Sequence, residues 1–274
     1  MSFAKSRILV PKLKDSYGPM LTSLLNQGIK VDTPQKKREI VTSFGQENKV
    51  EKAIWFNSLP LTDKLDFPYG WWMCDLRDPR IFPKIHVDTI FLCNKHFMKD
   101  YSDYFGAKVH YMPQIGYEVD MAIGRDVNWD IVFIGEENQM YHSNRKEYFD
   151  VLKEFNFKWI RGEKFTKDQN WIYYKTPISL AISPQFEGYT SNRLYNILSS
   201  GGFCLTLWFP GIEQLFTNHH HLVWFKNAED LKLIIKYYLA HPEKRQEIAN
   251  NGKKLYYEKY SASHKLEQML ALIK

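Results

Sequence analysis

Short, nearly continuous apolar runs are the feature that most restricts the fold of this 274-residue chain. Such runs are typical of strands buried on both faces, as in a parallel sheet. Strands of this kind that alternate with helical segments predict an α/β fold. The clearest runs are KAIWFNSL, GWWMCDL, TIFLCN, WDIVFIG, TPISLAIS, GFCLTLW and HLVWF.

The segments between the apolar runs carry helix signals. KHFMKDYSDYFG predicts a helix that ends at Gly106, and SNRKEYFDVLKEF predicts one with Ser143 as its N-cap. The stretch from NAEDL to YYEKY predicts two helices that are broken at His241 and Pro242. SHKLEQMLALIK predicts a last helix.

The strands and helices form two consecutive α/β series with a seam near residues 115–128. We therefore expect two Rossmann-like halves with a cleft between them, where strand ends from both sides meet. The predicted domains are residues 1–122, which would bind the acceptor, and residues 123–258, which would bind the donor. Residues 259–274 would form a C-terminal helix.

The positive charge of the chain is concentrated at its start. The formal net charge is +6, and residues 1–50 hold nine Lys or Arg against four Asp or Glu, a surplus of five. Two interpretations stay open. The cations could form solvated faces, or this end could bind an anionic partner such as nucleic acid or a phosphorylated acceptor.

The three cysteines are far apart in apolar runs, which is typical of buried free thiols in a reducing compartment. No apolar run approaches the ~20 residues of a membrane span, and no secretory leader is recognisable. We expect a protein of the cytoplasm, which for a phage-encoded protein would be that of the host.

Several motifs of other enzyme classes are missing. The sequence has no G-x-G-x-x-G, no G-x-x-x-x-G-K-[ST], no G-x-S-x-G and no H-E-x-x-H. It also lacks a D-x-D pair, so no metal site is predicted. The adjacent residues His219, His220 and His221 are interpreted as a loop before a strand.

One segment, EGYTSNRLYNILSSGG at residues 187–202, could carry binding chemistry. Small polar residues and Arg193 precede an apolar helical stripe that ends in two glycines. The start of a helix presents unpaired N–H groups and partial positive charge, which favour a phosphate. The residues alone fit either an ordinary N-cap or a phosphate site.

From about Trp129 onward, the chain resembles the donor-binding domain of GT-B glycosyltransferases, most of all the spore-maturation-protein-like branch. That branch carries N-R-x-[FY]-E-x-x-x-x-G-G where this chain has NRLYNILSSGG, and PGIEQLF and AEDLKLIIKYYLAHPEKRQEIANNGKKLYYEKYS also resemble it. WWMCDLRDPR and KVHYMPQIGYEVD resemble its tryptophan-rich strand and interdomain segment. The resemblance implies a GT-B fold, two Rossmann-like domains facing a cleft, with C-terminal helices packing back toward the N-terminal domain.

The resemblance further implies a nucleotide-sugar (NDP-sugar) co-substrate and no separate cofactor. Backbone and side-chain groups at the helix start would bind the diphosphate, and Arg193 would either reinforce them or pair internally. Gly135 would let the backbone approach the donor closely. Other cations would neutralise the leaving diphosphate or be surface charges. The helix-start residues are Tyr189, Thr190, Ser191 and Asn192, and the other cations are Arg145, Arg161 and Lys164.

The sequence departs from the branch at Asn196, where members usually carry a Glu that holds the donor ribose. Asn can still hydrogen-bond hydroxyl groups, but it brings no charge. Glu187 is a second candidate for a contact with the sugar.

The acceptor hydroxyl must lose a proton, and Asp75 and Asp78 follow the run GWWMCDL at a strand end. Either carboxylate could be the general base, or it could cap the strand end or pair with Arg77 or Arg80. An enzyme that retains anomeric configuration could do without such a base. Acceptor contacts are expected from Lys12, Lys14, Tyr17 and Arg77.

The sequence thus predicts a metal-independent glycosyltransferase that moves a hexose or pentose to an acceptor hydroxyl. The acceptor could be a saccharide, a lipid-linked group or a protein. It could also be a hydroxymethylated base in DNA, since phage DNA glycosyltransferases share this architecture. A non-catalytic protein that binds nucleotide-sugars is a further alternative, because Asn196 replaces the usual Glu. The oligomeric state is left open.

Overall fold

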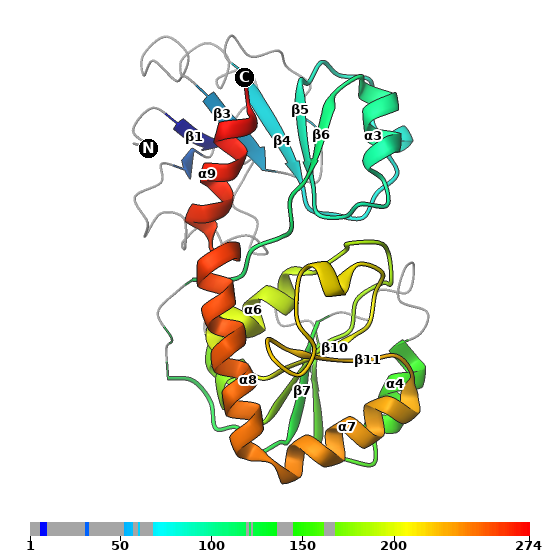
Figure 1. Cartoon of the computed structure of the whole chain (residues 1–274), viewed down its shortest axis with the longest axis vertical. Helices are drawn as coiled ribbons and strands as arrows, with labels where there is room; N and C mark the ends of the chain where they lie inside the picture. The colour runs from blue at the N-terminus through cyan, green and yellow to red at the C-terminus, as the bar shows by residue number, and fades with distance from the viewer. Residues whose placement is uncertain are drawn as a thin grey trace. The chain divides into compact units, whose positions relative to one another are not determined.

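The computed structural model describes residues 6–9, 31–32, 52–56, 60, 68–118, 121, 123–135, 145–161 and 168–274 (Figure 1). The chain divides into two compact units, residues 1–114 with 262–274, and residues 115–261. The chain therefore passes between the units after residues 114 and 261, whereas the sequence analysis places its boundaries after 122 and 258.

The first unit holds a parallel sheet whose described strands have the order β2-β1-β3-β4-β5-β6. The central strands β4 and β5 are buried along their whole length, as the continuous apolar runs predict. Strand β6 is at the edge of the sheet and is partly exposed. The strands are β1 (Ser6–Leu9), β2 (Val31–Asp32), β3 (Lys52–Phe56), β4 (Tyr69–Met73), β5 (Thr89–Leu92) and β6 (Lys108–Tyr111).

Aromatic side chains form much of the core of this unit. The Trp71 ring contacts Phe82, Tyr101 and Phe105 with centroid distances of 5.5–5.9 Å. Two of these rings come from α3 (Met98–Phe105), which follows the short 3-10 helix η2 (Pro79–Ile81). Gly106 ends α3 in the left-handed conformation, and its N–H donates to the Ser102 carbonyl, as predicted.

The C-terminal helix α9 (Ala262–Leu272) belongs to the first unit, although it follows the second in the chain. The Lys52 ammonium donates to the carbonyl oxygens of Leu270 and Ile273, at 3.3 and 2.5 Å. A cation is favourable there because the last carbonyls of a helix lack partners within the helix. The expectation that the C-terminal helix packs onto the N-terminal half is confirmed.

The second unit holds a parallel sheet with strand order β11-β10-β9-β7-β8. Strands β7, β9 and β10 are buried along their whole length, and the edge strand β8 is partly exposed. The elements in chain order are β7 (Ile131–Ile134), α4 (Arg145–Leu152), β8 (Phe157–Ile160), α5 (Gln169–Lys175), β9 (Ile178–Ala181), α6 (Asn192–Ser200), β10 (Cys204–Leu207), η3 (Ile212–Gln214), β11 (Val223–Phe225), α7 (Ala228–Ala240), α8 (Pro242–Leu255) and η4 (Tyr256–Tyr260).

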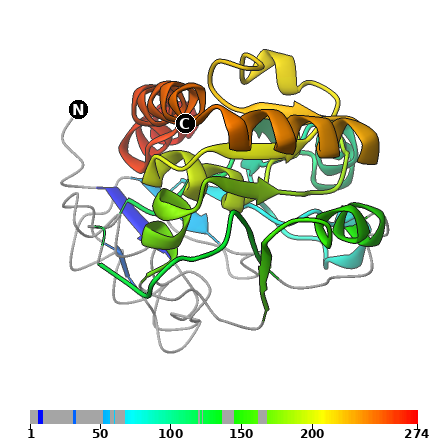
Figure 2. The same cartoon turned by 90° about the horizontal axis from the view of Figure 1, so that it is seen from below.

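Alternate strand residues point to opposite faces of this sheet and build two cores. Ile131 and Phe133 pack with α4 and α7 on one face, while Val132 and Ile134 pack with α5, α6 and η4 on the other. Helices on both faces explain why the strands read as continuous apolar runs. In Figures 1 and 2, α7 and α8 meet at a corner, the His241–Pro242 break that the sequence predicts.

The strand order of the second sheet reverses at β7. Helix α4 leads from β7 outward to β8, and α5 leads back past β7 to β9. In open α/β sheets, ligands bind outside the carboxyl ends of the strands at such a reversal. We therefore expect a ligand site between the carboxyl ends of β7 and β9.

Two elements of the second unit were not predicted. Helix α5 is short and buries the polar residues Gln169 and Asn170 together with Ile172 and Tyr173, so no apolar stripe marks it. At its C-terminal end α8 passes into the π-helix η4, where the sequence indicates one uninterrupted helix. Among the described residues, no helix combines the length and the apolar composition that a membrane span requires. The three cysteines are free.

We predict that Gly252→Ala destabilises the protein, although Ala normally favours a helix over Gly by about 1 kcal/mol. A Cβ at Gly252 of α8 would clash with the His221 carbonyl oxygen and lie 2.8 Å from Leu198. The free energy of unfolding should fall by about 1–3 kcal/mol, as for an overpacked core. Asn250→Ala, at an exposed position of α8, is the control and should change it by less than ~0.5 kcal/mol in a urea titration.

Candidate functional site

Helix α6 begins at the carboxyl end of the second sheet without a side-chain cap. Ser191 is at the N-cap in an extended conformation, but its side chain makes no capping hydrogen bond. Its hydroxyl instead accepts a 2.8 Å hydrogen bond from the Ser183 hydroxyl, just after β9. The first N–H groups of α6 thus have no side-chain acceptor from the N-cap residue, and the partial positive charge of the helix start is not offset there.

The other polar residues at the start of α6 differ in their burial and contacts. Thr190 is 1% exposed and its hydroxyl donates to the Tyr195 hydroxyl, so its side chain serves the core. Tyr189 lies close enough to Arg145 and Arg193 to affect the pKa of both guanidinium groups. Asn192 is the first residue of α6 and is half-buried.

The Arg193 guanidinium joins α6 to two strand ends. Its Nε donates to the carbonyl of Ile134 at 2.6 Å, and its Nη1 donates to the carbonyl of Ile182 at 3.4 Å. Its central carbon lies 4.3 Å from the centroid of the Phe133 ring. Of the two predicted roles, the internal pairing is present, and it holds the charge between the ends of β7 and β9.

Gly135 provides the space for this guanidinium. It follows β7 with φ of 153°, where an L side chain is strained, and a Cβ would clash with the Arg193 Nη2 atom. The Gly135 carbonyl accepts a 2.9 Å hydrogen bond from the Trp159 indole of β8. The sequence predicts that a donor approaches the backbone closely at Gly135, and the group that lies against Gly135 in the structure is the Arg193 guanidinium.

Arg145 brings a second guanidinium to the same place. It begins α4, is 5% exposed and donates from Nη2 to the Ile182 carbonyl at 2.8 Å. Its central carbon lies 5.0 Å from the centroid of the Phe133 ring. Burial, and then the charge of Arg193, lower the pKa of Arg145 to about 9. The alternative that Arg145 is a surface charge is therefore wrong.

The two arginines make the reversal point of the sheet strongly positive. Both contact one phenyl ring and donate to one carbonyl oxygen, so their charges are held close together. Burial also lowers the pKa of Arg193. An anion near this position would lower the electrostatic energy of both cations, and charge-assisted hydrogen bonds are the strong ones.

The remaining candidates of this unit lie around this centre or outside the described residues. The exposed Arg161 follows β8 and stacks 3.4 Å from the centroid of the Trp159 ring. Glu187 is exposed in a turn whose next residue, Gly188, donates to the Pro210 carbonyl after β10. Lys164 and Ser143 lie outside the described residues.

Asn196 is fully buried and serves the backbone of the chain. Its Oδ1 accepts a 3.0 Å hydrogen bond from the Tyr117 N–H, and the Tyr117 carbonyl accepts from Asn170 and Ser199. The Asn196 Nδ2 is buried without a hydrogen-bond partner.

In the first unit, Asp75 and Asp78 follow β4 and have different surroundings. Asp75 lies 3.5 Å from Arg77, and both side chains are 43% exposed. Asp78 caps η2 and accepts hydrogen bonds from the Arg80 backbone and guanidinium, which hold its pKa below the ordinary value. The structural alternative for Asp78, a cap paired with Arg80, is thus present, and such a carboxylate is a weak base.

Three acceptor candidates, Lys12, Lys14 and Tyr17, lie outside the described residues. Within the part of the chain that the structure describes, no three His, Cys, Asp or Glu side chains gather as metal ligands would. His219, His220 and His221 lie in the turn before β11, in agreement with the loop interpretation.

Sequence reasoning missed several groups at this centre. In the sequence, Phe133 is only one apolar residue of a predicted strand, and Ser183 and Trp159 belong to no motif. The carbonyls of Ile134 and Ile182 carry no sequence signal, because every residue has one. Their position after strands β7 and β9 is the only available clue, since strand ends at a reversal of strand order are preferred ligand positions.

The two doubly wound sheets define a GT-B glycosyltransferase fold. A glycosyltransferase from Rickettsia africae ESF-5 aligns over 97% of both chains with 8% identity and a TM-score of 0.63. Sucrose-phosphate synthase from Thermosynechococcus elongatus aligns over 98% of both chains with 9% identity and the same TM-score. Anabaena Alr3699/HepE in complex with UDP covers 98% of this chain and 99% of its own, with 10% identity and a TM-score of 0.61.

The sequence places the chain in a family as well. The model of the family described as "Glycosyl transferase-like" matches residues 130–271, just over half of the chain. The chain therefore belongs to the glycosyl transferase-like family, which confirms the predicted enzyme class. No curated protein matches the sequence.

We predict that Gly135→Ala disturbs the arginine centre. The new methyl group would strain the backbone at φ of 153° and displace the Arg193 guanidinium from the Ile134 carbonyl. The free energy of unfolding should fall by about 1–3 kcal/mol, as for other strained backbone positions. Gly106→Ala is the control, because it also has positive φ, 67°, but open space around its Cβ. Equal losses for both variants would show that Arg193 contributes nothing at Gly135.

Proposed function

We propose that this chain transfers a sugar from a nucleotide-sugar donor to an acceptor hydroxyl, and that the second unit binds the donor diphosphate. The observation that carries this proposal is the pair Arg145 and Arg193, held at the reversal of the second sheet. The uncapped start of α6 at the carboxyl end of this sheet adds N–H groups and a helix dipole. The proposal fits a chain of the glycosyl transferase-like family.

The chemistry of sugar transfer explains why positive charge is needed. Breaking the bond between sugar and phosphate leaves an oxocarbenium-like centre and a more negative diphosphate. Preorganised cations and N–H groups stabilise such developing charge without having to reorganise. Arg145, Arg193 and the start of α6 supply both kinds of group, so we propose transfer that does not depend on a metal ion. The exposed Arg161 beyond Trp159 is a further candidate contact.

The nucleotide itself must be found by experiment. Anabaena HepE is described in complex with UDP-glucose, and an alpha1,3-fucosyltransferase of the same fold is described with GDP-fucose. Both nucleotides carry the diphosphate that we expect Arg145 and Arg193 to bind. UDP and GDP are therefore the first probes for this chain.

Asp75 is our candidate for the general base of the transfer. It is half-exposed at the end of β4, and its ion pair with Arg77 is open to solvent, whereas Asp78 is committed to Arg80 and to capping η2. We retain Arg77 as the candidate acceptor contact in the described part of the first unit.

We predict that UDP or GDP raises the melting temperature of the protein by several degrees and that Arg193→Ala removes most of this shift. A ligand at 100 times its Kd stabilises by about 2.7 kcal/mol, and loss of a charge-assisted hydrogen bond costs about 1.5–3 kcal/mol, so the Kd should rise roughly 10- to 100-fold. The matched control is Arg245→Ala, because Arg245 is also half-buried and donates to two carbonyls, of Tyr238 and Leu239.

Two outcomes would contradict the donor site. The first is the absence of any shift across a full panel of nucleotides and nucleotide-sugars. The second is a Kd for UDP and GDP that Arg193→Ala leaves unchanged, when Arg245→Ala is measured in the same way. A shift that disappears when EDTA is added would refute the metal-independent form of the proposal.

We predict that Asp75→Asn lowers the rate of sugar transfer by roughly 10²- to 10⁴-fold, the usual contribution of a general base, and leaves the Kd for UDP unchanged. Nucleotide release should be followed by mass spectrometry with saccharide, protein and hydroxymethylated DNA acceptors. Asp78→Asn, the control, keeps an oxygen that can cap η2 and removes only the charge that pairs with Arg80, so it should leave the rate nearly unchanged. A full rate for Asp75→Asn would remove this residue from catalysis, and no release with any acceptor would favour a non-catalytic binder.

A further inference from the structure

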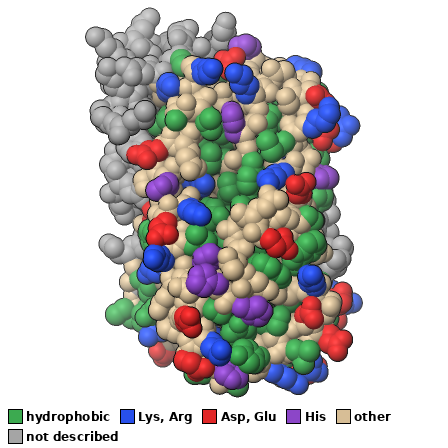
Figure 3. Space-filling view, viewed as in Figure 1, with side chains coloured by type: hydrophobic (Ala, Val, Ile, Leu, Met, Phe, Trp, Pro, Cys, Tyr) green, Lys and Arg blue, Asp and Glu red, His purple; other side chains and the backbone are tan. Residues whose placement is uncertain are grey.

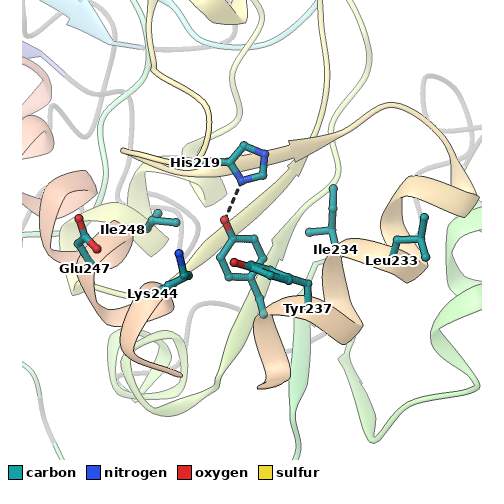
Figure 4. Close-up of a pocket in the computed structure, with 8 residues that line it drawn as sticks. His219, Leu233, Ile234, Tyr237, Lys244, Glu247 and Ile248 are labelled. Carbon is teal, nitrogen blue, oxygen red and sulfur yellow. Dashed lines mark hydrogen bonds between the residues drawn. The ribbon is translucent and has the colours of Figure 1, made fainter. Parts of the chain in front are cut away.

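A pocket in the second unit lies between α7 and α8 (Figure 4). It has a volume of about 600 Å³, within the range that suits a small molecule. One stripe of α7, one stripe of α8 and His219 from the turn before β11 line it. On the face drawn in Figure 3, histidine and hydrophobic side chains gather over these elements.

The position of this pocket separates it from the candidate donor site. His219 comes shortly before β11, which begins at Val223, so the pocket lies toward the amino ends of the parallel strands. Arg145 and Arg193 are at the carboxyl ends, beside Gly135 and Ile182. The two places are therefore at opposite ends of one sheet, and a ligand in the pocket would not compete with a donor nucleotide.

His219 is held over the pocket in an unusual backbone conformation. Among the described residues it is the only non-glycine residue with positive φ, 57°. Its ring stacks on Tyr238 and its Nδ1 is 2.7 Å from the Tyr238 hydroxyl, while its N–H donates to the Leu222 carbonyl. Figure 4 draws the His219 imidazole with the hydrogen bond to Tyr238 as a dashed line. Single strained residues of this kind concentrate at ligand sites.

The α7 side of the pocket presents aromatic and aliphatic surface to solvent. Tyr237 is 44% exposed and Leu233 is 60% exposed, and Ile234 lies beside them. Neighbouring large apolar side chains left in water indicate a surface that a ligand covers. One ring face of Tyr237 stacks on His241 at 4.2 Å, which fixes the orientation of the ring.

The α8 side adds polar groups of both signs. Lys244 and Glu247 are one helical turn apart and exposed, above the buried Ile248. Burial lowers the pKa of the His219 imidazole, which favours its neutral form, and the formal charges of Lys244 and Glu247 cancel. Such a wall does not select an anion such as a nucleotide. It offers donors and acceptors together, which suits neutral hydroxyl groups.

We propose that this pocket binds one unit of a neutral saccharide, with the sugar ring on Tyr237 and its hydroxyl groups on Lys244, Glu247 and His219. An aromatic face is apolar and electron-rich, and therefore fits the C–H face of a sugar ring. The pocket volume accommodates a single such unit with its hydration. If the protein transfers sugar as proposed above, this unit belongs to the acceptor chain or the product, and that last step alone rests on the proposed function.

The experiment is saturation-transfer difference NMR of the whole protein with neutral disaccharides of glucose, N-acetylglucosamine, mannose and galactose. We expect saturation transfer to at least one of them, and a Kd at least 10-fold weaker for Tyr237→Ala. The matched control is Tyr257→Ala, because Tyr257 is 45% exposed in the same unit but outside the pocket. His219→Gly is a second variant, because glycine accepts φ of 57° and the fold should persist without the ring.

The two proposals can fail separately. If Arg193→Ala loses the melting-temperature shift with UDP but still shows saturation transfer to a saccharide, the donor site and the pocket are separate sites. No transfer to any neutral saccharide, equal losses for Tyr237→Ala and Tyr257→Ala, or transfer only to sugar phosphates would overturn the pocket proposal. Self-association that Leu233→Asp abolishes would also overturn it, because a second copy would then cover the pocket.

Discussion

One guanidinium group joins three elements at the carboxyl end of the second sheet. Arg193 donates hydrogen bonds to the carbonyl of Ile134, the last residue of β7, and to the carbonyl of Ile182, which follows β9. Its guanidinium group also packs on the Phe133 ring. Arg193 belongs to the first turn of α6, so it ties the helix start to both strand ends at the reversal of the sheet. Gly135 is required beside it because any Cβ would occupy the same space. Arg145 reaches the same Ile182 carbonyl and the same Phe133 ring from α4.

A second set of contacts surrounds Asn196. The Tyr117 backbone is held by Asn196, Asn170 and Ser199, and the adjacent Gly116 N–H donates to the Tyr256 hydroxyl. Oδ1 of a neutral amide accepts from a backbone N–H without bringing a charge into a fully buried site, where an unpaired carboxylate would be costly. In this chain the Asn196 side chain therefore supports the backbone at Tyr117.

The two ends of the second sheet differ in their electrostatics. The carboxyl end concentrates two guanidiniums and a helix start, whereas the hollow at the amino end balances Lys244 against Glu247 beside aromatic rings. A site of the first kind favours an anion, and a site of the second kind favours a neutral polar molecule with an apolar face. Both follow from the direction of the helices, since α6 starts at one end of the sheet while α7 and α8 meet at the other.

The sequence by itself determined the α/β class, the central strands, the corner at His241 and the helix that begins within residues 187–202, because buried parallel strands and helix punctuation have local signals. It could not give α5, whose buried face includes Gln169 and Asn170, or the π-helix at Tyr256–Tyr260. Only the tertiary structure decided that Thr190 faces the core, that Asp78 pairs with Arg80, and that Arg145 and Arg193 share the Ile182 carbonyl. The first two facts depend on side-chain directions that the local sequence leaves open, and the third depends on a backbone carbonyl, which every residue has and no sequence pattern marks.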